Sequence, residues 1–201
     1  MNYKKYQKSR DLSWQILIKH KISQLPVKIS DICRENQIRI ISYKKGHEAI
    51  EELDLLQNTV HSDGFTVGKI IFYNEQCSIQ RQRFTVAHEL GHILLHNGRG
   101  VYNREPTTED IPIEQEANVF ASRVLAPACV LWGIGVNSAQ QISELCNISL
   151  QSAEFRFQRL QELYEREKSF MSKFGKSCFL MSGLERQVYN QFSDYIKRNK
   201  L

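Results

Sequence analysis

Two histidines four residues apart, with a glutamate directly after the first, constrain this chain more than any other feature. The sequence His88-Glu89-Leu90-Gly91-His92 lies in a stretch whose apolar spacing predicts one long helix over about residues 78–96. Residues four apart project from one face of a helix, so the two imidazoles can bind a single zinc ion. Glu89 then lies close enough to a water on that ion to accept its proton.

The rest of this stretch behaves as a helix that packs into a core. Phe84, Ala87, Leu94 and Leu95 supply apolar side chains, and Asn97 begins a stop signal. A glycine inside a helix costs about 1 kcal/mol, and we expect Gly91 to allow close approach of another element. His96 lies a further turn along, which carries it away from the metal. The simpler alternative is that His88 and His92 are ordinary histidines of a structural helix.

A catalytic zinc site needs a third protein ligand and one open position. The longer metzincin motif is absent, because Leu95 and Gly98 stand where that motif has a glycine and a third histidine. A carboxylate from a second helix remains, and the segment 113–121 offers Glu114 and Glu116. The alternative interpretation of this segment is an ordinary amphipathic helix whose carboxylates are solvated.

The two carboxylates point to different sides of this second helix, about 200° apart at 100° per residue. Glu114 shares its surface with Ala117 and Asn118, on the face whose apolar stripe can pack against the first helix. We therefore expect Glu114 to be the third ligand and Glu116 to face solvent or the rim of the site. Asn118, one turn after Glu114, is placed to orient a histidine ligand by a hydrogen bond.

Composition limits the broad class of protein. Hydrophobic residues make up 41% of the 201 and charged residues 24%, which is ordinary for a globular protein. The net charge of +5 is modest and makes nucleic-acid binding possible without favouring it. The five cysteines are scattered and form no C-x-x-C pair, so we expect reduced, mostly buried thiols. No stretch is apolar enough for a membrane span or signal peptide, which predicts a cytoplasmic protein.

Coarse patterning predicts an α+β fold, with a small sheet packed on helices and a helical C-terminal region. Apolar spacing over residues 46–56 predicts one helix, and residues 65–73 predict one or two strands around Gly68. We expect the strand at 69–73 to pair through its edge with an extended substrate peptide. Residues 168–178 have the composition of a linker, and Ser182 with Glu185 predicts the capping box of a last amphipathic helix.

The two helical motifs together resemble a known family. Residues 83–96 contain the H-E-x-x-H motif, residues 114–121 read Glu-Gln-Glu-Ala-Asn-Val-Phe-Ala, and 125–127 read Leu-Ala-Pro. With Asp63-Gly64-Phe65 upstream, these segments are similar to the ImmA/IrrE metallopeptidases over about residues 12–166. One departure is Ala126, where the family usually has methionine.

The resemblance carries several further expectations. It implies a thermolysin-like zincin core, one zinc ion, and a third ligand from the E-x-x-A-N element, which agrees with Glu114. It implies a metallopeptidase domain over residues 1–166, followed by a linker and an amphipathic helix over 167–201. It also implies a protein substrate, a helix-turn-helix transcriptional repressor whose cleavage relieves repression in a mobile element or a stress response.

Two other functions compete with this interpretation. Residues 138–166 form a pair of predicted helices that is similar to a helix-turn-helix, with Arg156 and Arg159 in its second helix. Phe155 and Phe157 weaken a DNA-binding role, since a recognition surface should be polar. The other alternative is a toxin–antitoxin regulatory protein with a non-catalytic zinc site.

Overall fold

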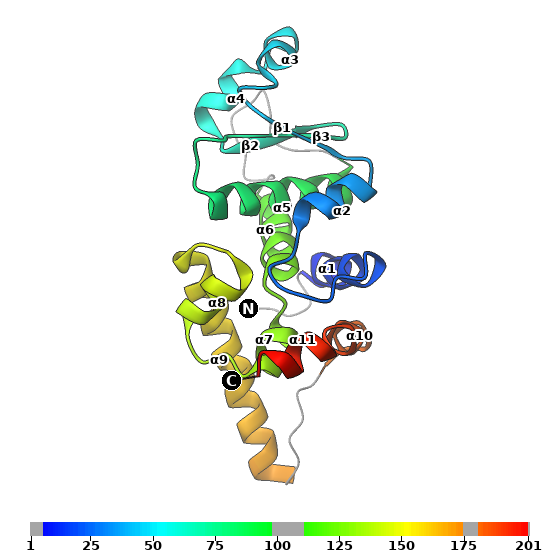
Figure 1. The fold of residues 1–201 in the computed structure, drawn as a ribbon, viewed down its shortest axis with the longest axis vertical. Helices are drawn as coiled ribbons and strands as arrows, with labels where there is room; N and C mark the ends of the chain where they lie inside the picture. The colour runs from blue at the N-terminus through cyan, green and yellow to red at the C-terminus, as the bar shows by residue number, and fades with distance from the viewer. Residues whose placement is uncertain (1–5, 98–110, 175–180, 201) are drawn as a thin grey trace. The chain divides into compact units, whose positions relative to one another are not determined.

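The computed structural model describes residues 6–97, 111–174 and 181–200, and Figure 1 traces its elements. The strands are β1 (Arg39–Ser42), β2 (Gly64–Val67) and β3 (Ile70–Tyr73). The helices are α1 (Gln7–Lys19), α2 (Ile29–Glu35), α3 (His47–Glu52), α4 (Leu56–His61), α5 (Ile79–His96), α6 (Ile111–Leu125), α7 (Ala128–Ile134), α8 (Ala139–Cys146), α9 (Leu150–Phe174), α10 (Gly183–Gln191) and α11 (Ser193–Arg198). The predicted α+β class, with a small sheet packed on helices, is confirmed.

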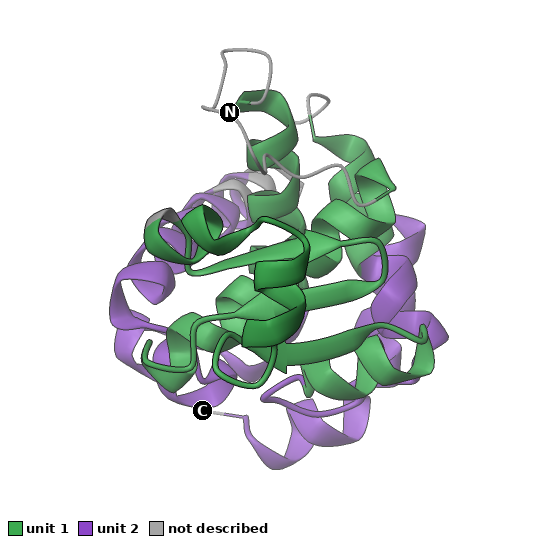
Figure 2. Ribbon diagram, turned by 90° about the horizontal axis from the view of Figure 1, so that it is seen from above, with its two compact units in different colours: residues 1–13, 28–125 green, residues 14–27, 126–201 purple. Residues whose placement is uncertain are grey.

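The chain forms two compact units, coloured separately in Figure 2. Unit 1 consists of residues 1–13 and 28–125, and unit 2 of residues 14–27 and 126–201. All three strands and the H-E-x-x-H helix α5 belong to unit 1, whereas α7 to α11 belong to unit 2. The division of the chain into a domain of residues 1–166 and a C-terminal region stays a prediction.

The sheet of unit 1 has the strand order β1-β3-β2. β3 pairs in parallel with β1 and antiparallel with β2, and Gly68 (φ +57°) supplies the left-handed residue in the turn from β2 to β3. Figure 1 shows α5 along one face of the sheet and α3 with α4 on the other. The sheet therefore lies directly on the helix that carries the histidines.

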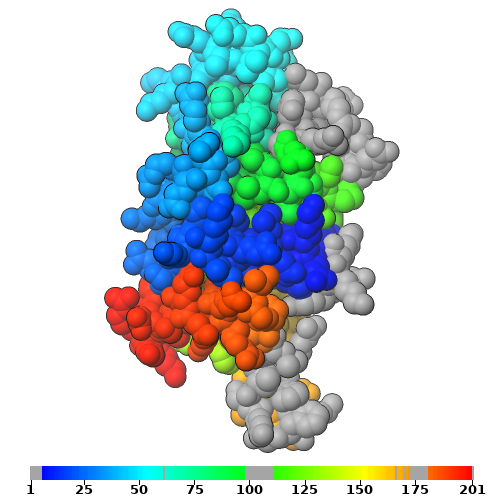
Figure 3. All heavy atoms as spheres, turned by 90° about the vertical axis from the view of Figure 1, so that its right-hand side faces the viewer, coloured from blue at the N-terminus to red at the C-terminus, as the bar shows by residue number. Residues whose placement is uncertain are grey.

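Aromatic side chains fill the space between the sheet and the short helices. Phe65 and Phe72 are cross-strand partners with ring centroids 5.2 Å apart, and they form a buried cluster with Ile50 and Leu55. The opposite side of these helices is open to solvent, as the cyan surface in Figure 3 shows, and Val60 is 72% exposed there.

The single helix predicted over residues 46–56 is wrong, because the structure has two short helices there. α3 ends at Glu52 and α4 begins at Leu56. Asp54 between them has φ +56°, a left-handed conformation that a continuing helix cannot contain. Leu53 and Leu56, which share helical spacing, are 49% and 40% exposed. Ile50 and Leu55 would lie about 140° apart on one continuous helix, and the break lets both side chains reach the buried cluster on the sheet.

Unit 2 is a helical assembly with its own core. Trp14, Leu17, Leu131, Ile134 and Phe192 are fully buried in it. The predicted capping box is confirmed, because the Ser182 and Glu185 side chains each bond the other's backbone N–H. The predicted last helix divides at Phe192 into α10 and α11.

The linker predicted from residue 168 is wrong over its first part, because α9 runs without a break to Phe174. The rest of that predicted linker lies outside the described residues. The predicted pair of helices at 138–166 corresponds to α8 and to the first two thirds of α9, and Asn147 in the left-handed conformation ends α8.

Two further expectations concern the chain as a whole. Cys33, Cys129 and Cys146 are buried, as predicted, and burial raises the pKa of Cys33 and Cys129 to about 12. In the described residues, one helical stretch (Ile111–Ile134) is long and apolar enough to cross a membrane. Because 67% of its most apolar window is buried, this stretch has the character of a core helix.

Candidate metal centre

Helix α5 is defined at both ends by its sequence. The hydroxyl of Ser78 accepts a hydrogen bond from the backbone N–H of Arg81 and caps the first turn. Asn97, in the left-handed conformation with φ +55°, ends the helix as predicted. Between these caps the helical repeat places His88 and His92 on one face, with ring centroids 4.7 Å apart.

Gly91 allows α6 to pack tightly against α5, as the sequence predicted. A Cβ added at Gly91 would lie 3.1 Å from Cδ1 of Phe120 and 3.2 Å from the Cα of Ala117. The second distance is to backbone, so a larger residue could be accommodated only by moving one helix. This approach brings the polar residues of α6, Glu114 and Asn118, to the histidines of α5.

The structure brings the three predicted ligands together. The Nε2 atoms of His88 and His92 are 3.0 Å apart. Glu114 lies across from both, with Oε2 3.1 Å from His88 Nε2 and Oε1 3.2 Å from His92 Nε2. Tetrahedral zinc with ligands at 2.0–2.1 Å would separate ligand atoms by about 3.3 Å. The described spacing is therefore close to that of a tetrahedral metal site.

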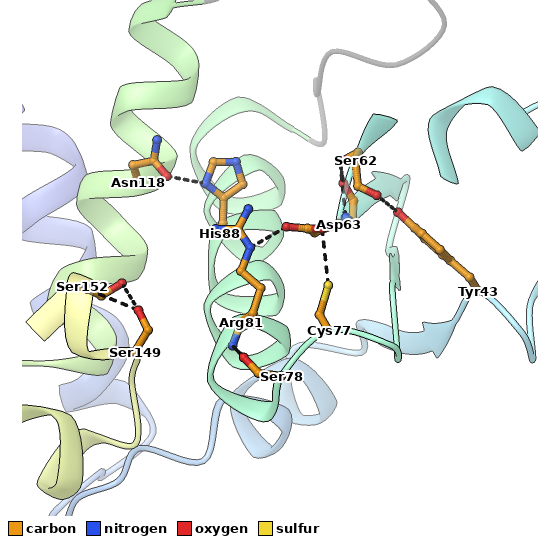
Figure 4. A network of polar contacts seen from close by, with 11 residues as sticks. Tyr43, Ser62, Asp63, Cys77, Ser78, Arg81, His88, Asn118, Ser149 and Ser152 are labelled. Carbon is orange, nitrogen blue, oxygen red and sulfur yellow. Dashed lines mark hydrogen bonds and ion pairs between the residues drawn. The ribbon is translucent and has the colours of Figure 1, made fainter. Parts of the chain in front are cut away.

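The hydrogen-bonding partners of these atoms favour a cation between them. Nδ1 of His88 lies 3.0 Å from Oδ1 of Asn118, the contact drawn in Figure 4. An amide oxygen only accepts, so Nδ1 carries the hydrogen, and in the neutral ring Nε2 presents a lone pair to the Glu114 carboxylate. Such facing acceptors repel one another unless a positive charge lies between them. The donor set of two imidazoles and a carboxylate suits zinc.

The pKa directions agree with this electrostatic picture. Burial acts to lower the pKa of His88, but the hydrogen bond to Glu114 and the nearby carboxylate charges outweigh it, so the net shift is upward. Burial likewise acts to raise the pKa of Glu114, but its bonds to His88 and His92 hold it far below its ordinary range. The cluster therefore favours a positive charge facing an ionised Glu114.

The carboxylate of Glu89 lies near the two histidines but is not one of the three predicted ligands. Its carboxylate and the ring nitrogens of His88 and His92 all lie within 4.8 Å of one another, and its side chain is almost wholly buried. Burial raises the pKa of Glu89, and the charges of the two histidines only partly oppose this. A carboxylate with a raised pKa beside a metal site is suited to accept and return a proton.

Glu116 was predicted to face solvent or the rim of the site, and its side chain is 27% exposed. Its Oε2 lies 3.4 Å from Nε2 of His96, so it contacts the histidine one turn beyond His92. Burial lowers the pKa of His96, although the charge of Glu116 opposes the shift. The two carboxylates of α6 thus meet different histidines of α5, and only Glu114 contacts His88 and His92.

The prediction that β3 offers an edge to a peptide is wrong. β3 is the central strand, with β1 on one side and β2 on the other. Within the described residues, the strand with one unpaired edge beside α5 is β2. A Cβ added at Gly64, the first residue of β2, would lie 2.3 Å from Cγ2 of Thr85 and 3.7 Å from Cγ of Glu89. β2 therefore packs on α5 at the level of Glu89.

A polar cluster beside this strand was missed by sequence reasoning. Asp63 forms an ion pair with Arg81 of α5 and accepts a hydrogen bond from the thiol of Cys77, as Figure 4 shows. In the sequence, Asp63-Gly64-Phe65 contributed only to the family resemblance. Charge complementarity between Asp63 and Arg81, eighteen residues later, was visible but carried no indication that the two meet.

A His-Glu-His cluster on one helix, lying beneath a small sheet, is the arrangement of a metal-dependent peptidase. The family described as the IrrE N-terminal-like domain, a family of peptidases, matches residues 44–158. This match covers more than half of the chain, and the chain belongs to that family. No curated protein matches the sequence. The predicted ImmA/IrrE-type resemblance is thereby confirmed, and with it a metallopeptidase role.

Proposed function

We propose that the chain is a zinc-dependent endopeptidase, with His88, His92 and Glu114 holding one zinc ion and Glu89 as the general base. The observation that carries this proposal is the convergence of His88, His92 and Glu114 to within 3.0–3.2 Å, with the Glu89 carboxylate beside them. A bound zinc ion would supply Lewis-acid polarisation of the scissile carbonyl and acidify the attacking water.

Proton transfer and the orientation of a histidine ligand would fall to two side chains of the protein, Glu89 and Asn118. The carboxylate of Glu89 takes a proton from the attacking water and returns it to the nitrogen of the leaving amine. Its raised pKa makes the protonated form accessible for that second transfer. Asn118 holds the ring of His88 through Nδ1, which keeps Nε2 directed at the metal.

The extended substrate peptide would pair with β2. In the antiparallel pairing of β2 with β3, the backbone N–H of Asn74 donates to the carbonyl of Asp63. Because hydrogen-bonded residues alternate along such a ladder, the backbone groups of Gly64 and Thr66 point to the unpaired edge. Those of Gly64 bond the side-chain oxygen of Ser62, so a peptide would pair with the backbone groups of Thr66. A peptide added there would run over the α5 face at Glu89.

For the substrate we propose a helix-turn-helix transcriptional repressor in the cytoplasm, whose cleavage relieves repression. The support for this step is the resemblance to the ImmA/IrrE metallopeptidases. The test is to incubate the protein with the repressor encoded beside it, with and without a chelator, and to measure intact masses. We expect two fragments whose masses sum to the repressor plus one water, formed only without chelator. An intact repressor under both conditions would contradict the proposal.

Direct DNA binding by α8 and α9 is not favoured. Arg156, one of the two candidate DNA-contacting arginines, is only 6% exposed and donates to the backbone carbonyl of Ala126 at 2.7 Å. Arg159 forms an ion pair with Glu162 on its own helix. Phe155 of α9 is 68% exposed, and a polar recognition surface would not present such an aromatic side chain.

A further inference from the structure

We propose that Asp63 is a positioning residue. Its ion pair with Arg81 fixes the beginning of β2 against the helix that carries Glu89, and so sets the height at which a substrate peptide pairs above the catalytic base. This inference rests on the proposed peptidase function and goes beyond it, because it assigns a role to residues that contact neither the metal ligands nor the reacting atoms.

The contacts of Asp63 tie one residue to three parts of unit 1 (Figure 4). Its Oδ2 accepts from Nε of Arg81, in the first turn of α5. Its Oδ1 accepts from the thiol of Cys77 at 3.4 Å, just before that helix. Its backbone carbonyl accepts from the N–H of Asn74 at 2.8 Å, directly after β3. Asp63 therefore joins the start of β2 to the end of β3 and to the start of α5.

The residue before Asp63 is held as well. The hydroxyl of Tyr43, which directly follows β1, donates to the backbone carbonyl of Ser62 at 2.9 Å. The side-chain oxygen of Ser62 bonds both backbone groups of Gly64. The segment from Ser62 to Gly64 is thus secured by polar contacts on both sides of the ion pair.

Because Gly64 lies directly against α5, the contacts that hold residues 62–64 also fix the position of β2 relative to Glu89. Its Cα lies so close to α5 that a Cβ there would overlap Cγ2 of Thr85, at 2.3 Å, and would be 3.7 Å from Cγ of Glu89. Any loosening of the segment changes the separation between the edge of β2 and Glu89. Arg81 precedes His88 by seven residues, about two turns of the same helix, so both share one face.

The exposure of the pair argues that its main role is positional. The Arg81 side chain is 57% exposed and that of Asp63 is 34% exposed. Ion pairs this open to water contribute little to folding, because water and salt screen the charges. A matched pair exists on α2, where Arg34 and Asp31 lie 2.9 Å apart with exposures of 74% and 36%. That pair joins residues of a single helix and holds no strand.

The experiment compares Asp63→Asn with Asp31→Asn in the full chain. We expect Asp63→Asn to raise the KM for casein, an unstructured protein probe, by about two- to five-fold, the range an exposed ion pair supports. We expect kcat and bound zinc to stay at parent values, and the backbone amides of residues 62–67 to exchange hydrogen faster. Asp31→Asn should change none of these quantities. Arg81→Lys, which keeps the charge, should fall between Asp63→Asn and the parent.

Two results would overturn the inference. One is an Asp63→Asn variant whose KM and amide exchange match those of Asp31→Asn. The other is a variant that loses zinc or melts well below the parent, which would make Asp63 a general structural residue. If the parent cleaves neither casein nor the repressor, the proposed function fails separately, and amide exchange alone decides whether Asp63 holds β2.

Discussion

Helix α5 of unit 1 and helix α10 of unit 2 each carry a buried glutamate two residues from a glycine, yet the two glutamates are in opposite situations. Glu89 is 6% exposed and Glu185 is 5% exposed. The carboxylate of Glu185 accepts from the backbone N–H of Ser182 at 3.1 Å and completes a helix cap. Within the described part of the chain, the carboxylate of Glu89 accepts no hydrogen bond, and burial raises its pKa.

The two glycines differ in the same sense. Gly91 lies against Phe120 and Ala117 of α6, whereas a Cβ at Gly183 would have no atom within 4 Å. In α10 the buried polar group is satisfied and the glycine is free, so the helix is complete by itself. In α5, by contrast, each residue has its role outside the helix. Gly91 makes room for α6, and Glu89 is available to a reacting group. Two glutamates that are equally buried can therefore have different functions, and the groups that each one contacts indicate which function it has.

The substitution Glu89→Gln tests the difference between Glu89 and Glu185 most strongly. We expect cleavage of the repressor to fall at least 100-fold, because general acid–base catalysis contributes about 10²–10⁴-fold. Bound zinc should stay at the parent level. The metal-free variant should unfold at the same free energy as the parent or a higher one, since the amide need not bury a charge. The measurements are initial rates, metal analysis and urea unfolding.

Two results for Glu89→Gln would contradict the proposed difference between Glu89 and Glu185. Cleavage above about a hundredth of the parent rate would remove Glu89 from the role of base. A large loss of folding stability would place Glu89 in the same category as Glu185.

The second prediction concerns the glycines. Gly91→Ala gains helix propensity but presses a methyl group on the backbone of Ala117, 3.2 Å away. Overpacking typically costs about 1–3 kcal/mol, so we expect net destabilisation of about 1 kcal/mol and weaker zinc binding. Gly183→Ala, the control, should stabilise the protein by about 0.4–1 kcal/mol. Chemical denaturation of both variants measures this, and equal effects would contradict the account of α5.

The smallest expected effect belongs to Glu185→Ala. Loss of its bond to the Ser182 N–H should lower the free energy of unfolding by about 1 kcal/mol and leave cleavage unchanged. The exposed Glu154 of α9 provides the control, and Glu154→Ala should change stability by less than about 0.5 kcal/mol. A drop in repressor cleavage by Glu185→Ala would show that unit 2 shapes the active site.

Features encoded locally were predictable from the sequence. Ser78 and Asn97 cap α5, and helical periodicity places His88 and His92 on one face of that helix. In the same way it places Glu114 with Asn118 on one face of α6. Gly91 indicated a close helix contact because a glycine in a helix interior costs about 1 kcal/mol and lets a neighbouring helix approach its Cα. For such features a few neighbouring residues contain the whole physical cause.

Features that depend on distant partners were not predictable in this way. The strand order decides that β2 rather than β3 is at the edge, and strand order is set by packing of the whole sheet. The ion pair of Asp63 with Arg81 depends on that same packing. The break at Asp54 and the full length of α9 also escaped, because helix ends without strong caps are decided by tertiary contacts.

The most direct test of the metal centre is bound zinc per chain in Glu114→Ala and Glu116→Ala, measured after dialysis. Glu114 contacts both His88 and His92, at 3.1 and 3.2 Å, whereas Glu116 contacts His96. We expect Glu114→Ala to be essentially free of zinc and Glu116→Ala to retain about one ion per chain, as a three-ligand site requires. If Glu116→Ala lost its zinc while Glu114→Ala kept it, the proposed centre would be wrong and Glu116 would be the ligand.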